Sequence, residues 1–271
     1  MRALPAAFDD RVVEPIDARL DDVAVSHRVQ IPWAIESGSR AWGFPSPDSD
    51  YDCRFFFVRD AASYLSPWRP RDVIETPLDP VLDVNGWDLI KAVKLLVAGN
   101  AVALEWLRSP CIYHGDAEFR DELVELGDRI VDRQAIGRHY AHVGSHQAAR
   151  HGLTGEIPLK TLFYALRPAA AVRWLVEHPE QSVPPMDLPT LLRETSVPAA
   201  VQRAVADLVA RKAETRELGV GQVPGELRTY IVEALEHGVE LFAERADRDE
   251  SAARQEAADF FGHLVSRYGP S

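Results

Sequence analysis

The sequence predicts an α/β domain over residues 1–113, followed by an all-helical domain over residues 114–271. Before about residue 114, short runs of β-branched and aromatic residues alternate with helical patterns, and Pro and Gly separate them. Beyond that point, long amphipathic patterns follow one another with almost no strand signal. A chain of 271 residues is long enough to bury two cores of ordinary size.

Strands are expected mainly in the first domain, where each candidate is a short apolar run bounded by turn-forming residues. Three runs fit this description: IPWAIE (residues 31–36), DCRFFFV (residues 52–58) and PVLDV (residues 80–84). CIYHG (residues 111–115) is a candidate edge strand. Two of these runs carry the acidic residues on which the functional interpretation depends.

Helices are expected wherever apolar residues recur at helical spacing. In WDLIKAVKLLVAGN (residues 87–100), Asp88 is the expected N-cap and Gly99 the expected stop. The first domain has further helical patterns at residues 9–27 and 101–109. The second domain has them at residues 116–128, 134–150, 158–178, 198–217, 224–245 and 249–268.

Composition and charge narrow the class of protein. The formal net charge is −12. This charge argues against an extended nucleic-acid-binding surface, because neutralising phosphates requires clustered Lys and Arg. No apolar run reaches the roughly 18 residues that a membrane span needs, and the first residues lack the apolar core of a signal peptide. We therefore expect a soluble cytoplasmic protein without a membrane partner. Cys53 and Cys111 are expected to be reduced thiols, since they form neither a zinc ligand set nor a disulfide framework.

Asp50 and Asp52 stand two residues apart at the beginning of an apolar strand. Because a strand alternates its side chains, both carboxylates are expected on the same face. Two carboxylates that close repel each other unless a cation neutralises them. Mg²⁺ suits such a pair, since it binds carboxylate oxygens and commonly completes its shell with substrate phosphates. The pair therefore predicts a metal site for Mg²⁺ or Mn²⁺.

Gly38 and Ser39 directly follow the strand at residues 31–36. Glycine lets the backbone approach a phosphate closely, and the N–H groups of a strand-to-helix turn attract anions. Alone, a Gly-Ser turn is usually a connector, and an Asp-x-Asp pair is usually a solvated loop or a helix cap. Their order and their placement between two apolar strands favour a joint site for nucleoside triphosphate chemistry.

GSRAWGFPSPDSDYD (residues 38–52) resembles the Gly-Ser, Asp-x-Asp signature of the DNA polymerase beta-like nucleotidyltransferase superfamily. Residues 36–58, 85–113 and 160–175 resemble its bacterial and phage branch of predicted nucleotidyltransferases associated with RNA repair. The resemblance covers about residues 30–180 and implies a mixed sheet with flanking helices, an α+β nucleotidyltransferase fold.

The resemblance implies roles for several acidic residues. Asp50 and Asp52 match the two metal-binding carboxylates of the superfamily. A third carboxylate normally comes from a neighbouring strand, and Asp83 in PVLDV is the best match. Asp88 is the competitor, although its position at a helix start explains it as a cap.

The reaction that the resemblance implies moves a nucleoside monophosphate from a nucleoside triphosphate (NTP) to a hydroxyl and releases pyrophosphate. The NTP is the substrate, Mg²⁺ or Mn²⁺ is the cofactor, and the acceptor is an RNA end, a protein or a small molecule. Gly38, Ser39 and Arg40 are expected at the nucleotide. Protein covalent chemistry is not required, because positioning and electrostatic stabilisation lower the barrier.

Cationic side chains on two helices are further candidates for nucleotide binding. Lys91 and Lys94 are three residues apart and share a helix face, and Lys91 is the one that we assign to the nucleotide. Lys160, Tyr164 and Arg167 lie at i, i+4 and i+7, a stripe that would close over the triphosphate or the base.

Two alternatives stay open. A helix would align His139, His142 and His146 as a metal site, and Arg133 with His139 has the spacing of some helical ribonuclease domains; such histidines are more often a polar face. The second alternative is a non-catalytic nucleotide-binding or antitoxin-like regulatory module. The intact Asp pair argues against it, because such a module has little chemical need for both carboxylates.

Overall fold

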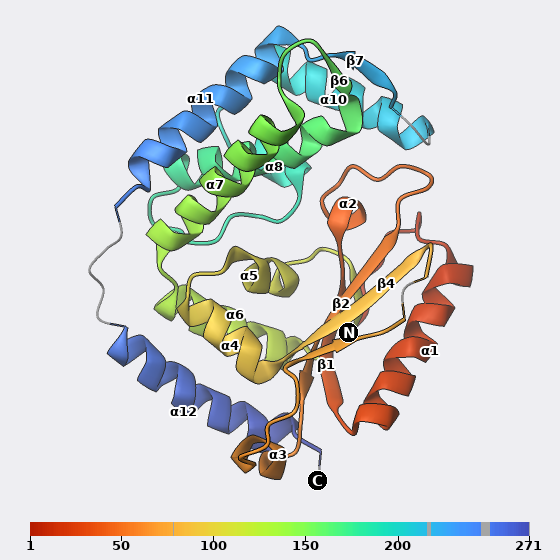
Figure 1. Ribbon diagram of the computed structural model, residues 1–271, viewed down its shortest axis with the longest axis vertical. Helices are drawn as coiled ribbons and strands as arrows, with labels where there is room; N and C mark the ends of the chain where they lie inside the picture. The colour runs from red at the N-terminus through yellow and green to blue at the C-terminus, as the bar shows by residue number, and fades with distance from the viewer. Residues whose placement is uncertain (78, 216–217, 245–249, 271) are drawn as a thin grey trace.

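A computed structural model describes residues 1–77, 79–215, 218–244 and 250–270. A five-stranded mixed sheet occupies the first part of the chain, with strand order β3-β4-β2-β1-β5 (Figure 1). β2 and β4 are parallel, whereas the other neighbouring strands are antiparallel. The strands are β1 (Gln30–Ser37), β2 (Tyr51–Val58), β3 (Val73–Glu75), β4 (Leu82–Asp88) and β5 (Ile112–Gly115). The expected α+β fold with a mixed sheet is confirmed.

Helices flank this sheet and form most of the rest of the chain (Figure 1). Those of the first part are α1 (Asp10–His27), α2 (Gly38–Ala41), α3 (Ala61–Leu65), α4 (Leu89–Val97), α5 (Ala101–Leu107) and α6 (Ala117–Ile130). Then follow α7 (Arg133–His151), α8 (Leu159–Glu177), α9 (Leu188–Arg193), α10 (Ala199–Glu214), α11 (Gly225–Leu241) and α12 (Ser251–Tyr268). A separate two-stranded antiparallel sheet pairs β6 (Glu156–Pro158) with β7 (Val220–Gln222). No helix in the described ranges is long and apolar enough to span a membrane.

The expected strands and long helices are present, with small shifts at their ends. Asp88 caps α4 by accepting a hydrogen bond from the backbone of Ile90, and Gly99 follows with a φ of +68°. The expected bounds at residues 217, 245 and 249 lie outside the described residues. The short elements α2, α3, α9, β3, β6 and β7 were not expected from the sequence.

The aromatic run of β2 is buried on both faces of the sheet. Phe55 and Phe57 pack in one core cluster with residues of α1, which covers that face (Figure 1). Phe56 and Val58 point the other way, into a larger cluster that continues through α4, α5 and α6 into the helices beyond. Because both faces of β2 are covered, the strand is a continuous apolar run rather than an alternating one.

The later helices take two different places. α7, α8 and α11 pack against one another on one side of the sheet, whereas α12 returns to pack against α4 and α6 (Figure 1). A buried group also ties α5 to this bundle: the Glu105 carboxylate accepts hydrogen bonds from Tyr140 on α7 and Arg167 on α8. We propose that the boundary between the first domain and the helical domain lies near residue 114.

Candidate functional site

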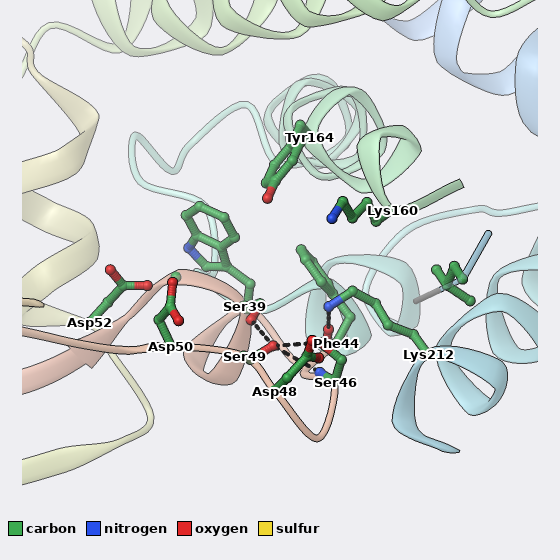
Figure 2. Close-up of a pocket in the computed structure, with 13 residues that line it drawn as sticks. Ser39, Phe44, Ser46, Asp48, Ser49, Asp50, Asp52, Lys160, Tyr164 and Lys212 are labelled. Carbon is green, nitrogen blue, oxygen red and sulfur yellow. Dashed lines mark hydrogen bonds between the residues drawn. The ribbon is translucent and has the colours of Figure 1, made fainter. Parts of the chain in front are cut away.

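The ends of three strands bring the acidic residues together. In the β1–β2 ladder Ser37 lies opposite Asp52, and in the β2–β4 ladder Asp52 lies opposite Asp83. Asp50 immediately precedes β2. A cavity of about 320 Å³ opens at this edge of the sheet and extends beneath the later helices (Figure 2). It is lined by Gly38, Ser39, Trp42, Phe44, Ser46, Asp48, Ser49, Asp50, Asp52, Lys160, Tyr164, Lys212 and Leu218.

Gly38 of the Gly-Ser turn lies directly against the Asp52 side chain. Its φ is +64°, a region that favours glycine. A Cβ atom added to Gly38 would lie 2.1 Å from Oδ2 of Asp52, closer than any two non-bonded atoms tolerate. Glycine is therefore required here both by the backbone conformation and by the Asp52 carboxylate.

Hydrogen bonds hold the loop of residues 42–50 that joins α2 to β2 (Figure 2). The Ser39 hydroxyl donates to Oγ of Ser49 at 2.9 Å, and the backbone N–H of Ser46 donates to the same atom at 2.9 Å. Arg40 does not line the cavity: its guanidinium donates to the carbonyl oxygens of Ser49 and Asp50 at 2.6 and 3.2 Å. These contacts position Asp50 at the start of β2.

Burial raises the pKa of the Asp52 carboxyl, because a charge is less stable away from water. Arg54 acts in the opposite direction, and the neighbouring Asp83 and Asp50 add to the increase. A divalent cation would relieve this repulsion. Asp50 and Asp52 therefore fit an ion that takes carboxylate oxygens and completes its shell with phosphate oxygens of a substrate, as Mg²⁺ does.

Arg54 lies between Asp52 and Asp83. Its Nη2 is 3.2 Å from Oδ1 of Asp52 and 2.6 Å from Oδ2 of Asp83. Asn85 donates to the other oxygen of Asp83 at 2.5 Å. Across the described part of the chain, no group of three or more His, Cys, Asp or Glu side chains is arranged to hold a metal ion. Asp83 thus lies beside Asp52 but is joined to it by an arginine.

Asp88, the competing acidic residue, lies at the other end of β4. Its side chain is buried, accepts hydrogen bonds from Arg59 and Tyr64, and caps α4. These partners give Asp88 a structural role, so no role in the cavity is needed to explain it.

The cationic stripe of α8 is divided in the structure. Lys160 and Tyr164 line the cavity, as the proposed nucleotide contacts require. Arg167 is buried away from it, donates to Glu105 at 2.7 Å and to the carbonyl oxygen of Met186 at 3.2 Å, and does not line the cavity. Lys91 also lies elsewhere, with its ammonium 5.0 Å from the centre of the Trp87 ring.

Glu36 is a site residue that the sequence interpretation missed. Its carboxylate is fully buried, accepts the backbone N–H of Asp52 at 3.0 Å, and accepts the Tyr113 hydroxyl at 2.5 Å. Burial raises the pKa of Glu36 to about 8, although these hydrogen bonds oppose the increase. The available signal was an acidic residue inside the apolar run IPWAIE.

Lys212 is the second residue that was missed. It comes from the last turn of α10, is 8% exposed, and donates from Nζ to the carbonyl oxygen of Phe44 at 2.7 Å (Figure 2). Burial lowers its pKa; Asp48 opposes this effect, whereas Lys160 and Arg40 add to it. No local motif marks this lysine, because its partners lie far away in the sequence.

The histidines of α7 do not form a metal site within the described residues. His142 and His146 are exposed, and burial lowers the pKa of His139. Arg133 donates instead to the carbonyl oxygens of Leu175 and Gln181.

Comparison with known proteins adds to this geometry. The sequence model named RlaP, the RNA repair pathway DNA polymerase beta family, matches residues 12–262. The chain belongs to this family. Its resemblance to the RNA-repair-associated branch of the polymerase beta superfamily is thereby confirmed. The RlaP match includes the Gly-Ser turn, the Asp pair and both lysines of the cavity.

Two individual proteins are similar to this RlaP family member. "Uncharacterized protein YcgL" of Bacillus subtilis (strain 168) is 34% identical over 232 residues, which cover 84% of this chain and 88% of that protein. A crystal structure of a nucleotidyltransferase-like protein from Exiguobacterium sibiricum 255-15 aligns with a TM-score of 0.30 and 11% identity, covering 94% of this chain and 80% of that one.

Proposed function

We propose that this protein is a metal-dependent nucleotidyltransferase that moves a nucleoside monophosphate from an NTP to a hydroxyl acceptor. The contact between Gly38 and the Asp52 carboxylate is the observation that carries the proposal. It joins a turn suited to phosphate and a carboxylate suited to a metal in one cavity. Membership of a polymerase beta family supports the same reaction class.

Asp50 and Asp52 would hold Mg²⁺ or Mn²⁺, with Asp83 as the third carboxylate. When bound, the metal would neutralise the triphosphate and lower the pKa of the acceptor hydroxyl. Asp83 is preferred to Asp88, because it lies opposite Asp52 and its side chain is 33% exposed.

In the proposed reaction, the acceptor oxygen bonds to the α-phosphorus while the bond from that phosphorus to the bridging oxygen breaks. Pyrophosphate leaves with the electron pair, and we assign the hydroxyl proton to Asp83. The backbone at Gly38 and the hydroxyl of Ser39 orient the phosphates, and Lys160 and Tyr164 cover them from α8. Positioning and charge stabilisation supply the rate enhancement.

The acceptor is the hydroxyl of an RNA end, a protein or a small molecule. The RNA repair description of the family supports an RNA end. The net charge of −12 favours a short contact with an RNA terminus over a grip on a long duplex.

The test measures pyrophosphate release with Mg²⁺ and each NTP, over RNA, protein and small-molecule acceptors. Asp52→Asn keeps the shape of the side chain but removes its charge, and we expect at least about a hundredfold loss of turnover, comparable to losing one transition-state contact. Asp121→Asn, at an exposed position of α6, is the matched control and should retain wild-type turnover. Equal turnover in Asp52→Asn and wild type would contradict the proposed role of Asp52.

A non-catalytic nucleotide-binding or antitoxin-like module is the second candidate. The ion pairs of Arg54 with Asp52 and Asp83 favour it, because they neutralise these carboxylates without a metal. Tight NTP binding with no pyrophosphate release from any acceptor would support this module over the enzyme.

A further inference from the structure

The cavity is electrostatically polarised along its length. Asp50 and Asp52 lie at one end and Lys160 and Lys212 lie toward the other (Figure 2). Ser39, Ser49 and the carboxylate of Asp48 lie between them. The chain has four lysines, Lys91, Lys94, Lys160 and Lys212. Two of them line this one cavity although they come from different helices, α8 and α10.

The Lys212 ammonium has more N–H donors than acceptors among the described residues. An ammonium group carries three N–H donors. Within the described residues, it donates to one acceptor, the Phe44 carbonyl oxygen, and forms no ion pair. A buried cation without a paired anion is costly, so this end of the cavity is suited to an anionic ligand.

We propose that Lys212, together with Lys160, binds the terminal phosphates of the triphosphate substrate. This inference rests on the proposed function and deepens it. The α-phosphorus then lies toward Asp50 and Asp52, and the β- and γ-phosphates lie toward the lysines. As the bond from the α-phosphorus breaks, the charge that develops on the pyrophosphate faces two ammonium groups.

Lys212 also connects ligand binding to the loop of residues 42–50. Phe44, its present partner, belongs to the loop that joins the Gly-Ser turn to the Asp pair. An anion bound at Lys212 therefore lies next to a segment that positions Asp50. α10 would thus contribute to the site directly, although it lies beyond residues 30–180, which carry the sequence resemblance.

A purely structural role for Lys212, bridging α10 to Phe44, makes a different prediction. Loss of a structural bridge would loosen the whole cavity and weaken every ligand by a similar factor. Loss of a terminal-phosphate contact would weaken triphosphates selectively and leave monophosphates unchanged.

The experiment measures binding of inorganic tripolyphosphate, each NTP and the matching nucleoside monophosphates by calorimetry, with and without Mg²⁺. The variants are Lys212→Met, which keeps the alkyl chain, and Lys212→Arg, which keeps the charge. Lys94→Met removes an exposed lysine of α4 outside the cavity and is the matched control. Thermal melting reports whether each variant folds.

We expect Lys212→Met to bind tripolyphosphate and NTP at least about tenfold more weakly, because hydrogen bonds to charged groups are worth roughly that much. Its monophosphate affinity should not change, Lys212→Arg should recover part of the loss, and Lys94→Met should match wild type. Equal tripolyphosphate binding by Lys212→Met and wild type would overturn the inference. So would an equal loss for monophosphates and triphosphates.

These outcomes separate the inference from the proposed function. In one outcome, wild type binds tripolyphosphate, Lys212→Met selectively loses this binding, and no NTP releases pyrophosphate. This result would support the phosphate site and contradict nucleotidyl transfer. If wild type releases pyrophosphate but Lys212→Met binds triphosphates normally, the result supports nucleotidyl transfer and contradicts the proposed role of Lys212. If wild type binds neither tripolyphosphate nor NTP, both are overturned.

Discussion

The two walls of the cavity differ in how the chain builds them. One wall comes from a single contiguous stretch, residues 38–52, in which the Gly-Ser turn, its loop and the Asp pair follow one another. The opposite wall comes from α8 and α10, whose contributing residues Lys160 and Lys212 are separated by other elements. A local motif specifies the first wall, whereas tertiary packing specifies the second. Each wall can therefore be disrupted separately.

Gly38→Ala should have the largest effect, because it breaks the contiguous wall. The new Cβ would overlap the Asp52 carboxylate, and the backbone would be held at a positive φ. Together these cost about 3 kcal/mol of folding free energy, and displacement of Asp52 should lower pyrophosphate release at least about a hundredfold. Turnover assays and urea denaturation measure the two effects.

Gly262→Ala is the control for this prediction. Gly262 lies in α12 with open space around its Cβ position, so the substitution should leave activity unchanged and raise helix stability by up to about 1 kcal/mol. An active Gly38→Ala variant would show that the contact with Asp52 does not constrain the site.

Arg167→Met should have the next largest effect, because it weakens the attachment of the remote wall. It also removes the guanidinium that lies 4.5 Å from the centre of the Trp42 ring in the contiguous wall. Arg167 and Glu105 form a buried ion pair between α8 and α5. Removing the arginine leaves Glu105 buried and unpaired, which should lower the free energy of unfolding by about 3–5 kcal/mol. Urea denaturation provides the measurement.

Two further variants test the cause of that loss. Arg173→Met, on the same helix, breaks an exposed pair with Glu177 and should cost no more than about 0.5 kcal/mol. Adding Glu105→Gln to Arg167→Met removes the unpaired charge and should restore part of the lost stability. The explanation is wrong if Arg167→Met and Arg173→Met are equally stable.

Glu36→Gln should disturb the geometry of the cavity least of the three variants, because Glu36 lies behind the contiguous wall and does not line the cavity. Burial raises the pKa of Glu36 from 4.5 to about 8, so between these values the folded state binds more protons than the unfolded state. Stability from this group is therefore fully present below about pH 4.5 and decreases as pH rises toward 8. Glutamine cannot ionise, so the variant should lose this slope and be more stable at pH 8 by up to about 4 kcal/mol.

Denaturation curves between pH 5 and 9 measure the Glu36 effect. Glu125→Gln, at an exposed position of α6, should keep the wild-type slope. If the slope of Glu36→Gln equals that of wild type, another buried group causes the pH dependence.

The contrast between the walls also explains what the sequence could predict. The runs around Trp33 and Phe56 have the length and the β-branched or aromatic content of strands, and both are strands. Asp50 and Asp52 could be proposed as site residues because their signal lies within a few positions of the sequence. β3, β6 and β7, with three residues each, are too short to leave a periodic pattern.

The remote wall was harder to predict for physical reasons. The i, i+4, i+7 spacing predicted that Lys160, Tyr164 and Arg167 share one face of a helix. Because α8 is buried along most of its length, these residues differ in exposure: Tyr164 is 44% exposed, whereas Arg167 is 8% exposed. Lys212 near the end of α10 resembles an ordinary solvated lysine. Its contact with Phe44 spans 168 positions of sequence, which no local pattern encodes.

The return of α12 to α4 and α6 has a consequence for how the protein is made. α12 follows every other described element in the chain, yet Ala257 and Leu264 of this helix belong to the same apolar core as the sheet. Ribosomes release a chain from its N-terminus, and domains that use only early residues can fold during synthesis. Here that core is complete only when α12 has emerged, so the sheet cannot reach its final packing before residues 251–268 have been synthesised.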